Sequence, residues 1–437
     1  MDLNTLTLRH SGTVLKLAFR KLFRMLASIG AKKEPRREAG EPLIDVKDLI
    51  AASSIEELNR KAEQYFSVLP DWDFHLAKPF STVKDAPGLL INFATMLQGL
   101  DLAPGLRLLD FGAGTGWTSR YLSQLGCEVI VLDVSQTALE IAKELYRRQP
   151  VIGHWPQPKF LPFDGYRIDL PDASVDRILC FDSFHHAVNP DAILREFARV
   201  LKPGGIAAFA EPGPDHSKRP PSQFEMRTYG VIENDIDIHA IWRTAREAGF
   251  SDIQLAAYNI PPFHVDLEHY DELLRGGESY LRFAENTRSF LRDVRNFFLR
   301  RAGEARPDSR KPEGLLAEIR IDMPSAANAG QTIAVRATVK NAGRAWWLPS
   351  SNPFGGVSLA CHLYGANDEL LAFDHAWQPL TDVAEGIAPG ESVEVAFALP
   401  ALAAGSYTIE FDCVANRVAW FAQLGSETVR RDVTIKA

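Results

Sequence analysis

Residues 106–116, LRLLDFGAGTG, decide the fold class of this chain. An apolar strand runs directly into Asp110 and then into glycines at positions 112, 114 and 116. Glycine permits a tight turn into the next helix, and because it lacks a Cβ a ligand can approach the backbone closely. The spacing differs from the GxGxxG pattern of dinucleotide-binding turns, so no pyrophosphate site is inferred. The segment predicts a strand, a ligand-binding turn and a helix, in that order.

Strand and helix patterns alternate from Leu106 to about Asn259, and helical patterns at 46–66 and 86–100 precede them. This alternation predicts an α/β, doubly wound, Rossmann-like domain with ligands at the carboxyl ends of its strands. A long helix is predicted over 278–301. The predicted strands lie at residues 106–111, 127–134, 159–163, 175–181, 205–212 and 252–259.

Short alternating strands follow residue 315, separated by turn residues such as Asn341 and Gly390, and predict an all-β sandwich. We therefore expect four parts. They are a basic helix with a linker (1–44), an α/β domain with an inserted lid segment (214–236) and a C-terminal helix (45–301), a linker (302–314) and the β-sandwich (315–437).

Charge and cysteine content exclude several classes of protein. The formal net charge of -8 makes nucleic acid an improbable partner, because phosphate binding needs excess cations. The 4 cysteines show no CxxC pair and no zinc-type spacing to histidine, so no metal site is predicted. With no signal-peptide pattern and no long apolar span, the expected location is the cytoplasm.

The amino-terminal segment differs from the rest in charge. Residues 12–29 place Leu15, Phe19 and Leu22 on one helical face and cations such as Lys16 and Arg20 on the other. Such a helix can lie on an anionic membrane surface, which would make the protein peripheral at the inner face of the cytoplasmic membrane. Packing against its own protein, or a dimer contact, is the alternative.

Asp133 ends the second predicted strand, about twenty residues beyond the glycine turn. A carboxylate at this place can accept hydrogen bonds from both ribose hydroxyls of a nucleoside ligand. The structural alternative is a helix N-cap, although Ser135 could fill that role.

LLDFGAGTG, VLDVS at 131–135, the segment 164–176 and ARVLKPGG at 198–205 resemble the motifs of class I S-adenosylmethionine-dependent methyltransferases of type 11. The resemblance covers roughly residues 60–260 and implies S-adenosyl-L-methionine as cofactor. It implies that Asp110 lies near the methionine amino group, Asp133 holds the ribose and Asp164 accepts the adenine amino group, above a floor of Gly112, Gly114 and Gly116. The alternatives are a cap for Asp110 and a solvated turn acid for Asp164.

The methyl acceptor should meet the cofactor beyond the fourth and fifth strands. Transfer to a hydroxyl needs alignment and a group that takes the proton. His185 and His186 follow the fourth strand and Glu211 ends the fifth, so these three are the candidate catalytic residues. Helix capping is the alternative for the histidines, and a solvated strand end for Glu211.

The segment 339–347, VKNAGRAWW, with Trp420, is similar to immunoglobulin-like modules fused to bacterial surface-polysaccharide biosynthesis proteins. Most of the tryptophans of this part of the chain, Trp346, Trp347, Trp377 and Trp420, are expected in the core. The resemblance implies a glycan or glycolipid acceptor, with polysaccharide-assembly enzymes as partners of the C-terminal domain. The alternatives are a methyltransferase for a lipid or small metabolite, and a non-catalytic cofactor-binding scaffold.

Overall fold

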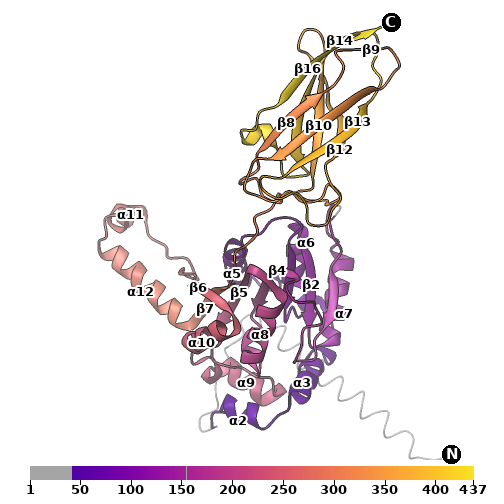
Figure 1. The fold of residues 1–437 in the computed structure, drawn as a ribbon. Helices are drawn as coiled ribbons and strands as arrows, with labels where there is room; N and C mark the ends of the chain where they lie inside the picture. The colour runs from indigo at the N-terminus through magenta and orange to yellow at the C-terminus, as the bar shows by residue number, and fades with distance from the viewer. Residues whose placement is uncertain (1–41, 154) are drawn as a thin grey trace, which may run out of the picture. The chain divides into compact units, whose positions relative to one another are not determined.

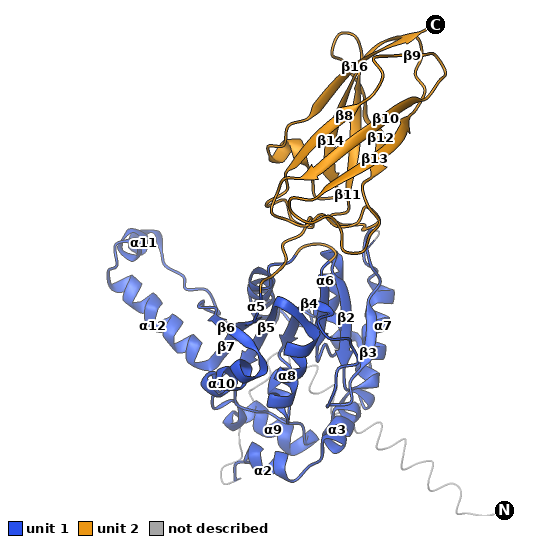
Figure 2. Cartoon of the chain, viewed as in Figure 1, with its two compact units in different colours: residues 1–102, 106–303 blue, residues 103–105, 304–437 orange. Residues whose placement is uncertain are grey.

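A computed structural model describes residues 42–153 and 155–437 of the chain. The amphipathic helix predicted over 12–29 lies outside the described residues. The chain divides into two compact units, the first comprising Met1–Leu102 and Leu106–Gly303 and the second Ala103–Gly105 and Glu304–Ala437 (Figure 2). Within the described part, none of the helices has the length and apolar character needed to cross a membrane.

The first unit is built on a seven-stranded sheet with the order β3-β2-β1-β4-β5-β7-β6. The first five strands in this order are parallel, and β7 runs antiparallel to both of its neighbours. The strands are β1 Arg107–Phe111, β2 Glu128–Asp133, β3 Lys159–Pro162, β4 Val175–Phe181, β5 Leu201–Pro212, β6 Phe250–Leu255 and β7 Val294–Arg301. The predicted Rossmann-like α/β fold is confirmed.

Helices cover both faces of this sheet because its strands are apolar on both sides (Figure 1). Leu108 and Val131 pack with α5, α6 and α7 on one face, whereas Leu109 and Ile130 pack with α8 and α10 on the other. The helices of the unit are α2 Val46–Ala51, α3 Ile55–Ser67, α4 Asp73–Leu76, α5 Ala86–Leu100, α6 Trp117–Gln124, α7 Gln136–Arg148, α8 Pro190–Val200, α9 Pro220–Tyr229, α10 Ile238–Ala248, α11 Leu267–Leu274 and α12 Glu278–Asp293.

The helix predicted over 278–301 is wrong in its last third. The helix α12 ends at Asp293, and the next eight residues form β7, which fills the place between β5 and β6. Phe297 and Leu299 alternate with more exposed neighbours and are fully buried in the sheet core. A short apolar run fits helical and strand periods alike, and pairing with two strands decided between them.

The second unit is a two-sheet β-sandwich. One sheet has the order β13-β10-β8 and the other β12-β11-β14-β16-β9, with β15 (Ala419–Trp420) beside β14. Their inner faces share one apolar core. The strands are β8 Ala317–Asp322, β9 Ala326–Asn328, β10 Ile333–Asn341, β11 Val357–Tyr364, β12 Leu370–Pro379, β13 Ser392–Leu399, β14 Gly405–Ala415 and β16 Val429–Lys436.

Of the tryptophans expected in this core, only Trp347 is fully buried. Trp377 lies on the edge strand β12 and keeps 43% of its surface exposed, so the core expectation is wrong for that residue. Cys361 and Cys413 are both buried free thiols.

Candidate active site

A cavity of about 450 Å³ lies at the carboxyl ends of β1, β2 and β4. Its volume falls within the range of small-molecule sites. The glycine turn, Asp133 and the loop after β4 form part of its wall. The wall comprises Ile55, Leu58, Asn59, Ala62, Tyr65, Phe66, His75, Lys78, Leu89, Phe111, Gly112, Ala113, Gly114, Thr115, Trp117, Leu132, Asp133, Val134, Phe163, Gly165, Phe181, Asp182, Ser183, His186, Ala187, Val188, Asn189, Ile193, Glu225, Val231 and Ile232.

The three glycines of the turn are needed for different structural reasons. All have positive φ, of 63° at Gly112, 53° at Gly114 and 76° at Gly116. A Cβ on Gly112 would lie 2.6 Å from Ser183 Cβ, and one on Gly116 would lie 2.7 Å from Ala142 Cβ. A Cβ on Gly114 would meet no protein atom within 4 Å. Packing therefore requires the outer two glycines, while Gly114 leaves open space where a ligand can lie.

Asp110 is fully buried at the base of the turn. Its Oδ2 accepts hydrogen bonds from Thr118 Oγ1 at 2.7 Å and Ser119 Oγ at 2.5 Å, whereas Oδ1 is buried without a hydrogen-bond partner among the described residues. Burial outweighs these bonds and raises the pKa of Asp110 to about 6. A buried unpaired acceptor favours a polar partner nearby, although Asp110 is not itself in the cavity wall.

Asp133 lines the cavity, as expected for a ligand-contacting acid. Its Oδ2 accepts the Gly114 N–H and its Oδ1 the Ser135 N–H, both at 2.8 Å. Burial raises the pKa of Asp133 to about 6 despite these bonds. Ser135, not Asp133, caps α7, because its side chain accepts the Ala138 N–H. The helix-cap alternative for Asp133 is thus excluded.

Asp164 is not placed as the resemblance implies. Phe163 and Gly165 on either side of it line the cavity, but the Asp164 side chain is exposed and does not. Its Oδ1 accepts the N–H groups of Tyr166 at 2.7 Å and Arg167 at 3.0 Å. The carboxylate closes a local turn, which is the alternative that the sequence left open.

The sequence did not single out the polar residues that the amino-terminal segment brings to the cavity. Tyr65 on α3, His75 on α4 and Lys78 line it. Burial raises the pKa of Tyr65 to about 12 and lowers that of His75 to about 4, and it also lowers the pKa of Lys78. Only helical periodicity was readable there, and no motif spacing marked these residues.

The candidate bases His185 and Glu211 are both buried and are hydrogen-bonded to each other. His185 Nδ1 lies 2.7 Å from Glu211 Oε2, and the same carboxylate accepts the N–H groups of Ser183, Phe184 and His185 at 2.8–3.2 Å. Burial disfavours the imidazolium, but the hydrogen bond and charge of Glu211 outweigh it and raise the pKa of His185 to about 9. Neither residue is in the cavity wall, so direct contact of either with an acceptor is not supported.

His186 is the one of the three candidates that lines the cavity. Its Nδ1 lies 2.5 Å from the Ile232 carbonyl oxygen, which orients the ring. Its side chain keeps 44% of its surface exposed, yet desolvation by the surrounding cavity wall and the charge of the neighbouring His185 lower the pKa of His186. Neither histidine caps the next helix, since Asn189 is the N-cap residue of α8.

The predicted lid segment 214–236 contributes Glu225, Val231 and Ile232 to the same wall. It also carries Glu233, which is buried against three histidines. Glu233 Oε2 lies 2.7 Å from His216 Nε2 and 3.9 Å from His185 Nε2, and Oε1 lies 3.7 Å from His186 Nδ1.

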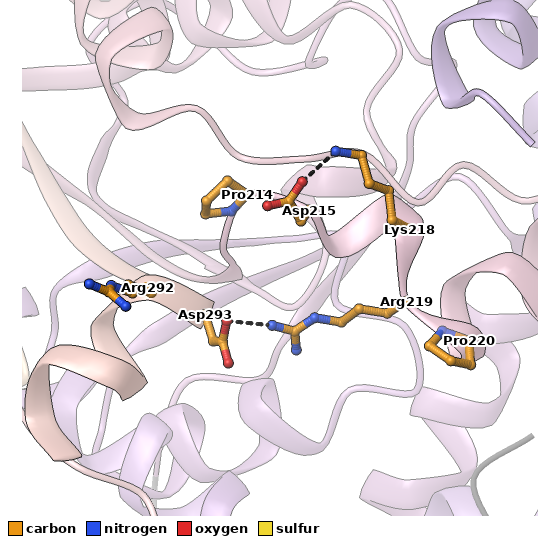
Figure 3. Close-up of a pocket in the computed structure, with 7 residues that line it drawn as sticks. All are labelled: Pro214, Asp215, Lys218, Arg219, Pro220, Arg292 and Asp293. Carbon is orange, nitrogen blue, oxygen red and sulfur yellow. Dashed lines mark hydrogen bonds and ion pairs between the residues drawn. The ribbon is translucent and has the colours of Figure 1, made fainter. Parts of the chain in front are cut away.

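A second hollow of about 580 Å³ carries no sequence motif (Figure 3). Its charges are largely matched, since Lys218 pairs with Asp215 and Arg219 with Asp293. It is lined by Pro214, Asp215, Lys218, Arg219, Pro220, Arg292 and Asp293. We therefore assign the cofactor to the cavity beside the glycine turn.

Comparison with known proteins identifies a methyltransferase domain in the first unit. Residues 109–209 match the family model described as a methyltransferase domain. The chain is 33% identical over 117 residues to methyltransferase GfsG of Streptomyces halstedii, covering 26% of this chain and 41% of the relative. It is 34% identical over 184 residues to the sarcosine/dimethylglycine N-methyltransferase of Halorhodospira halochloris, covering 40% and 60%.

Other similar proteins are more distant. The sterol 24-C-methyltransferase of Eremothecium gossypii is 24% identical over 200 residues, covering 43% of this chain and 53% of its own. The solved structure of Haemonchus contortus phosphoethanolamine N-methyltransferase 2 with S-adenosyl-L-methionine is 17% identical with a TM-score of 0.40, covering 58% and 61%. The chain spans about half the length of these curated relatives.

The described residues fit the cofactor of this family. Gly114 leaves open space beside Asp133, the residue that the resemblance assigns to the ribose, and Asp110 Oδ1 has no hydrogen-bond partner among the described residues. The chain therefore contains an S-adenosylmethionine-dependent methyltransferase domain of Rossmann-like fold, matched over residues 109–209.

Proposed function

We propose that this chain transfers the methyl group of S-adenosylmethionine to a hydroxyl oxygen of a cell-surface polysaccharide intermediate. One observation supports the proposal that the chain transfers a methyl group. A single cavity has the glycine turn and Asp133 in one part of its wall and the polar side chains of Tyr65, Lys78 and His186 in another. A donor and an acceptor can thus meet in one enclosed space.

S-adenosylmethionine supplies an electrophilic methyl group, so the chain has to align the acceptor and remove its proton. The acceptor O–H bond breaks, the O–C bond forms as the S–C bond breaks, and the electron pair of that bond stays on sulfur. In this proposal the proton of the acceptor hydroxyl passes to His186, with His185 and Glu211 behind it. His186 lines the cavity wall, while Glu211 and His185 orient that side of the cavity.

Two features support a glycan acceptor. The C-terminal sandwich resembles the immunoglobulin-like modules of polysaccharide biosynthesis proteins. Its edge strand β12 also exposes Phe373 and Trp377, and both rings lie within 6 Å of the Trp420 ring. Exposed aromatic faces of this kind can stack on sugars or contact a partner enzyme.

The proposed location is the cytoplasm, with residues 12–29 holding the protein at an anionic inner membrane surface. In this proposal the apolar helical face enters the interface and the cations contact lipid headgroups. Sedimentation with anionic vesicles tests it. Full-length protein should co-sediment at low salt and lose binding when residues 1–37 are removed, and equal binding of both forms would contradict it.

A lipid acceptor is the second candidate, and the apolar part of the wall favours it. Leu58, Phe66 and Leu89 line the cavity. Two relatives are named for sterol and squalene methylation. This alternative would use the same cofactor side and the same wall.

Mass spectrometry of surface glycans and lipids from a deletion strain separates the two candidates. Loss of a 14-dalton increment from a sugar residue, restored by the wild-type gene but not by the Asp133→Ala gene, is expected. Loss of methylation from a lipid alone would assign the second candidate. Unchanged glycans and lipids would contradict both.

A further inference from the structure

Three imidazoles and two carboxylates gather beside the cavity, from segments far apart in the sequence. His185 and His186 form the turn η1 (Phe184–His186), Glu211 ends β5, and His216 and Glu233 come from the 214–236 segment. The ring centroids of His185 and His186 lie 4.0 Å apart, and those of His185 and His216 lie 5.1 Å apart. We call these five residues the His/Glu cluster.

Glu211 orients His185 as outer carboxylates orient metal-binding histidines. Its carboxylate accepts three backbone N–H groups and lies 2.7 Å from His185 Nδ1. With Nδ1 as the donor in that bond, Nε2 faces Glu233 Oε2 at 3.9 Å. A carboxylate that holds one nitrogen of an imidazole leaves the other nitrogen free to bind a metal.

The distance between Glu233 and His185 fits two ligands of one ion better than a hydrogen bond. Glu233 Oε2 lies 3.9 Å from His185 Nε2, which is too long for a hydrogen bond. His186 Nδ1 lies 3.7 Å from Glu233 Oε1 but donates to the Ile232 carbonyl oxygen, so the nitrogen that His186 can offer a metal is Nε2. Two ligand atoms about 2.1 Å from a common metal are separated by roughly 3–4 Å. One ligand atom from each of His185, His186 and Glu233 can be chosen so that all lie within 4.8 Å of one another.

His216 adds a second supporting contact. Its Nε2 lies 2.7 Å from Glu233 Oε2, which fixes the carboxylate. Its other nitrogen, Nδ1, is buried with no hydrogen-bond partner among the described residues. The cluster thus has more nitrogen atoms and carboxylate oxygens than its own hydrogen bonds use.

We propose that His185, His186 and Glu233 bind a divalent transition-metal ion of the zinc type, with Glu211 and His216 as outer positioning residues. Two imidazoles and one carboxylate form a donor set that suits zinc, iron or manganese and leaves a coordination position open. Because His186 lines the cavity, an ion held by these three residues would lie beside the cavity. This site departs from the sequence expectation of no metal.

The role of the ion rests on the proposed function, but its binding does not. A cation beside the acceptor hydroxyl would lower the pKa of that hydroxyl, as zinc does for bound water. The proton would then leave to solvent, and His186 would act as a ligand rather than as a base. Metal binding and methyl transfer can therefore be tested separately.

The test uses the full-length protein after dialysis against a chelator. Calorimetry with Zn²⁺ should show one site per chain, absorption spectroscopy with Co²⁺ should show a low-symmetry visible band, and Mg²⁺ should not compete. Glu233→Gln and His186→Gln should each weaken Zn²⁺ binding by about tenfold to a hundredfold or more. S-adenosylmethionine affinity checks that each variant is folded.

His239→Gln is the matched control, because His239 is an exposed histidine on α10 outside the cluster. It should leave Zn²⁺ affinity and stoichiometry unchanged. Substoichiometric binding by wild-type protein, or equal affinity in folded His186→Gln and His239→Gln, would overturn the site. Zinc binding without any methyl transfer would keep the site and remove the proposed function instead.

Discussion

The Gly114 N–H donates a 2.8 Å hydrogen bond to Asp133 Oδ2, which ties the turn after β1 to the end of β2. The other oxygen of Asp133 accepts the Ser135 N–H at the start of α7. One buried carboxylate thus holds two backbone segments and also lines the cavity. Its removal should affect both the shape of the turn and the binding of the cofactor.

Asp133→Ala should weaken S-adenosylmethionine binding at least tenfold, because a charge-assisted acceptor contributes about 1.5–3 kcal/mol. Asp164→Ala is the control, since its exposed carboxylate caps a local turn outside the wall. We expect that variant to bind within about twofold of wild type. Calorimetry measures both, and a loss in Asp164→Ala as large as in Asp133→Ala would restore the adenine-contacting role.

Two glycine substitutions should separate folding from binding. Gly116→Ala should destabilise the first unit by about 2–4 kcal/mol, because its Cβ would press on Ala142 at a positive φ. Gly114→Ala should cost only about 1–2 kcal/mol of backbone strain, since nothing lies within 4 Å, yet should weaken cofactor binding more. Urea unfolding and calorimetry together measure this, and the opposite ranking would contradict it.

Cofactor affinity should fall in mild acid. The pKa values of Asp110 and Asp133 are both raised to about 6, so both carboxylates are ionised at pH 7.5 and protonated below pH 6. A protonated carboxyl group accepts hydrogen bonds from the cofactor less well than a carboxylate does. Protonation of each of the two groups should therefore weaken cofactor binding about tenfold by pH 5. The apo protein alone gains stability from these two groups as pH falls, because the folded state binds the protons more tightly. The rise in melting temperature on adding S-adenosylmethionine, measured at pH 7.5 and at pH 5, checks the prediction. A rise that is the same at both pH values would contradict it.

Glu211→Gln should destabilise the protein by about 2–4 kcal/mol. The carboxylate accepts three buried backbone N–H groups, and an amide nitrogen cannot replace an accepting oxygen. His186→Gln, at the cavity surface, should cost less than about 1 kcal/mol and lower turnover by roughly 10²–10⁴-fold. Denaturant titration and a rate assay on the identified acceptor separate the two, and near-normal turnover in His186→Gln would remove that residue from the chemistry.

Residues 304–437 should fold alone, because the second unit has its own apolar core between two sheets. A cooperative melt followed by tryptophan fluorescence is expected. Trp347→Ala should lower the stability by about 3–5 kcal/mol, since the ring is fully buried against Phe421. Trp377→Ala, on the exposed edge strand, is the control and should change it by less than about 1 kcal/mol. Gradual, non-cooperative melting of the isolated segment would contradict an independent core.

The local patterns of the sequence were sufficient for the parallel part of the sheet. Strand alternation, the glycine turn and Asp133 at the end of β2 depend on residues within about thirty positions of one another, so their geometry follows from short-range periodicity and turn chemistry. The same reasoning failed for β7, whose assignment depends on pairing with β5 and β6. Sequence spacing also placed Asp164 correctly on a loop beside the cavity but could not tell which way its side chain turned.

The sequence by itself determined a Rossmann-like domain, the cofactor turn and a following all-β part, because hydrophobic periodicity and glycine spacing are local properties. Only the tertiary structure decided which acceptor-side residues meet. Tyr65, His186 and Glu233 lie on segments separated by more than forty residues, and chain spacing carries no information about contacts made across such distances. Burial decided the rest, since it locked His185 to Glu211 behind the wall and left His186 facing the cavity.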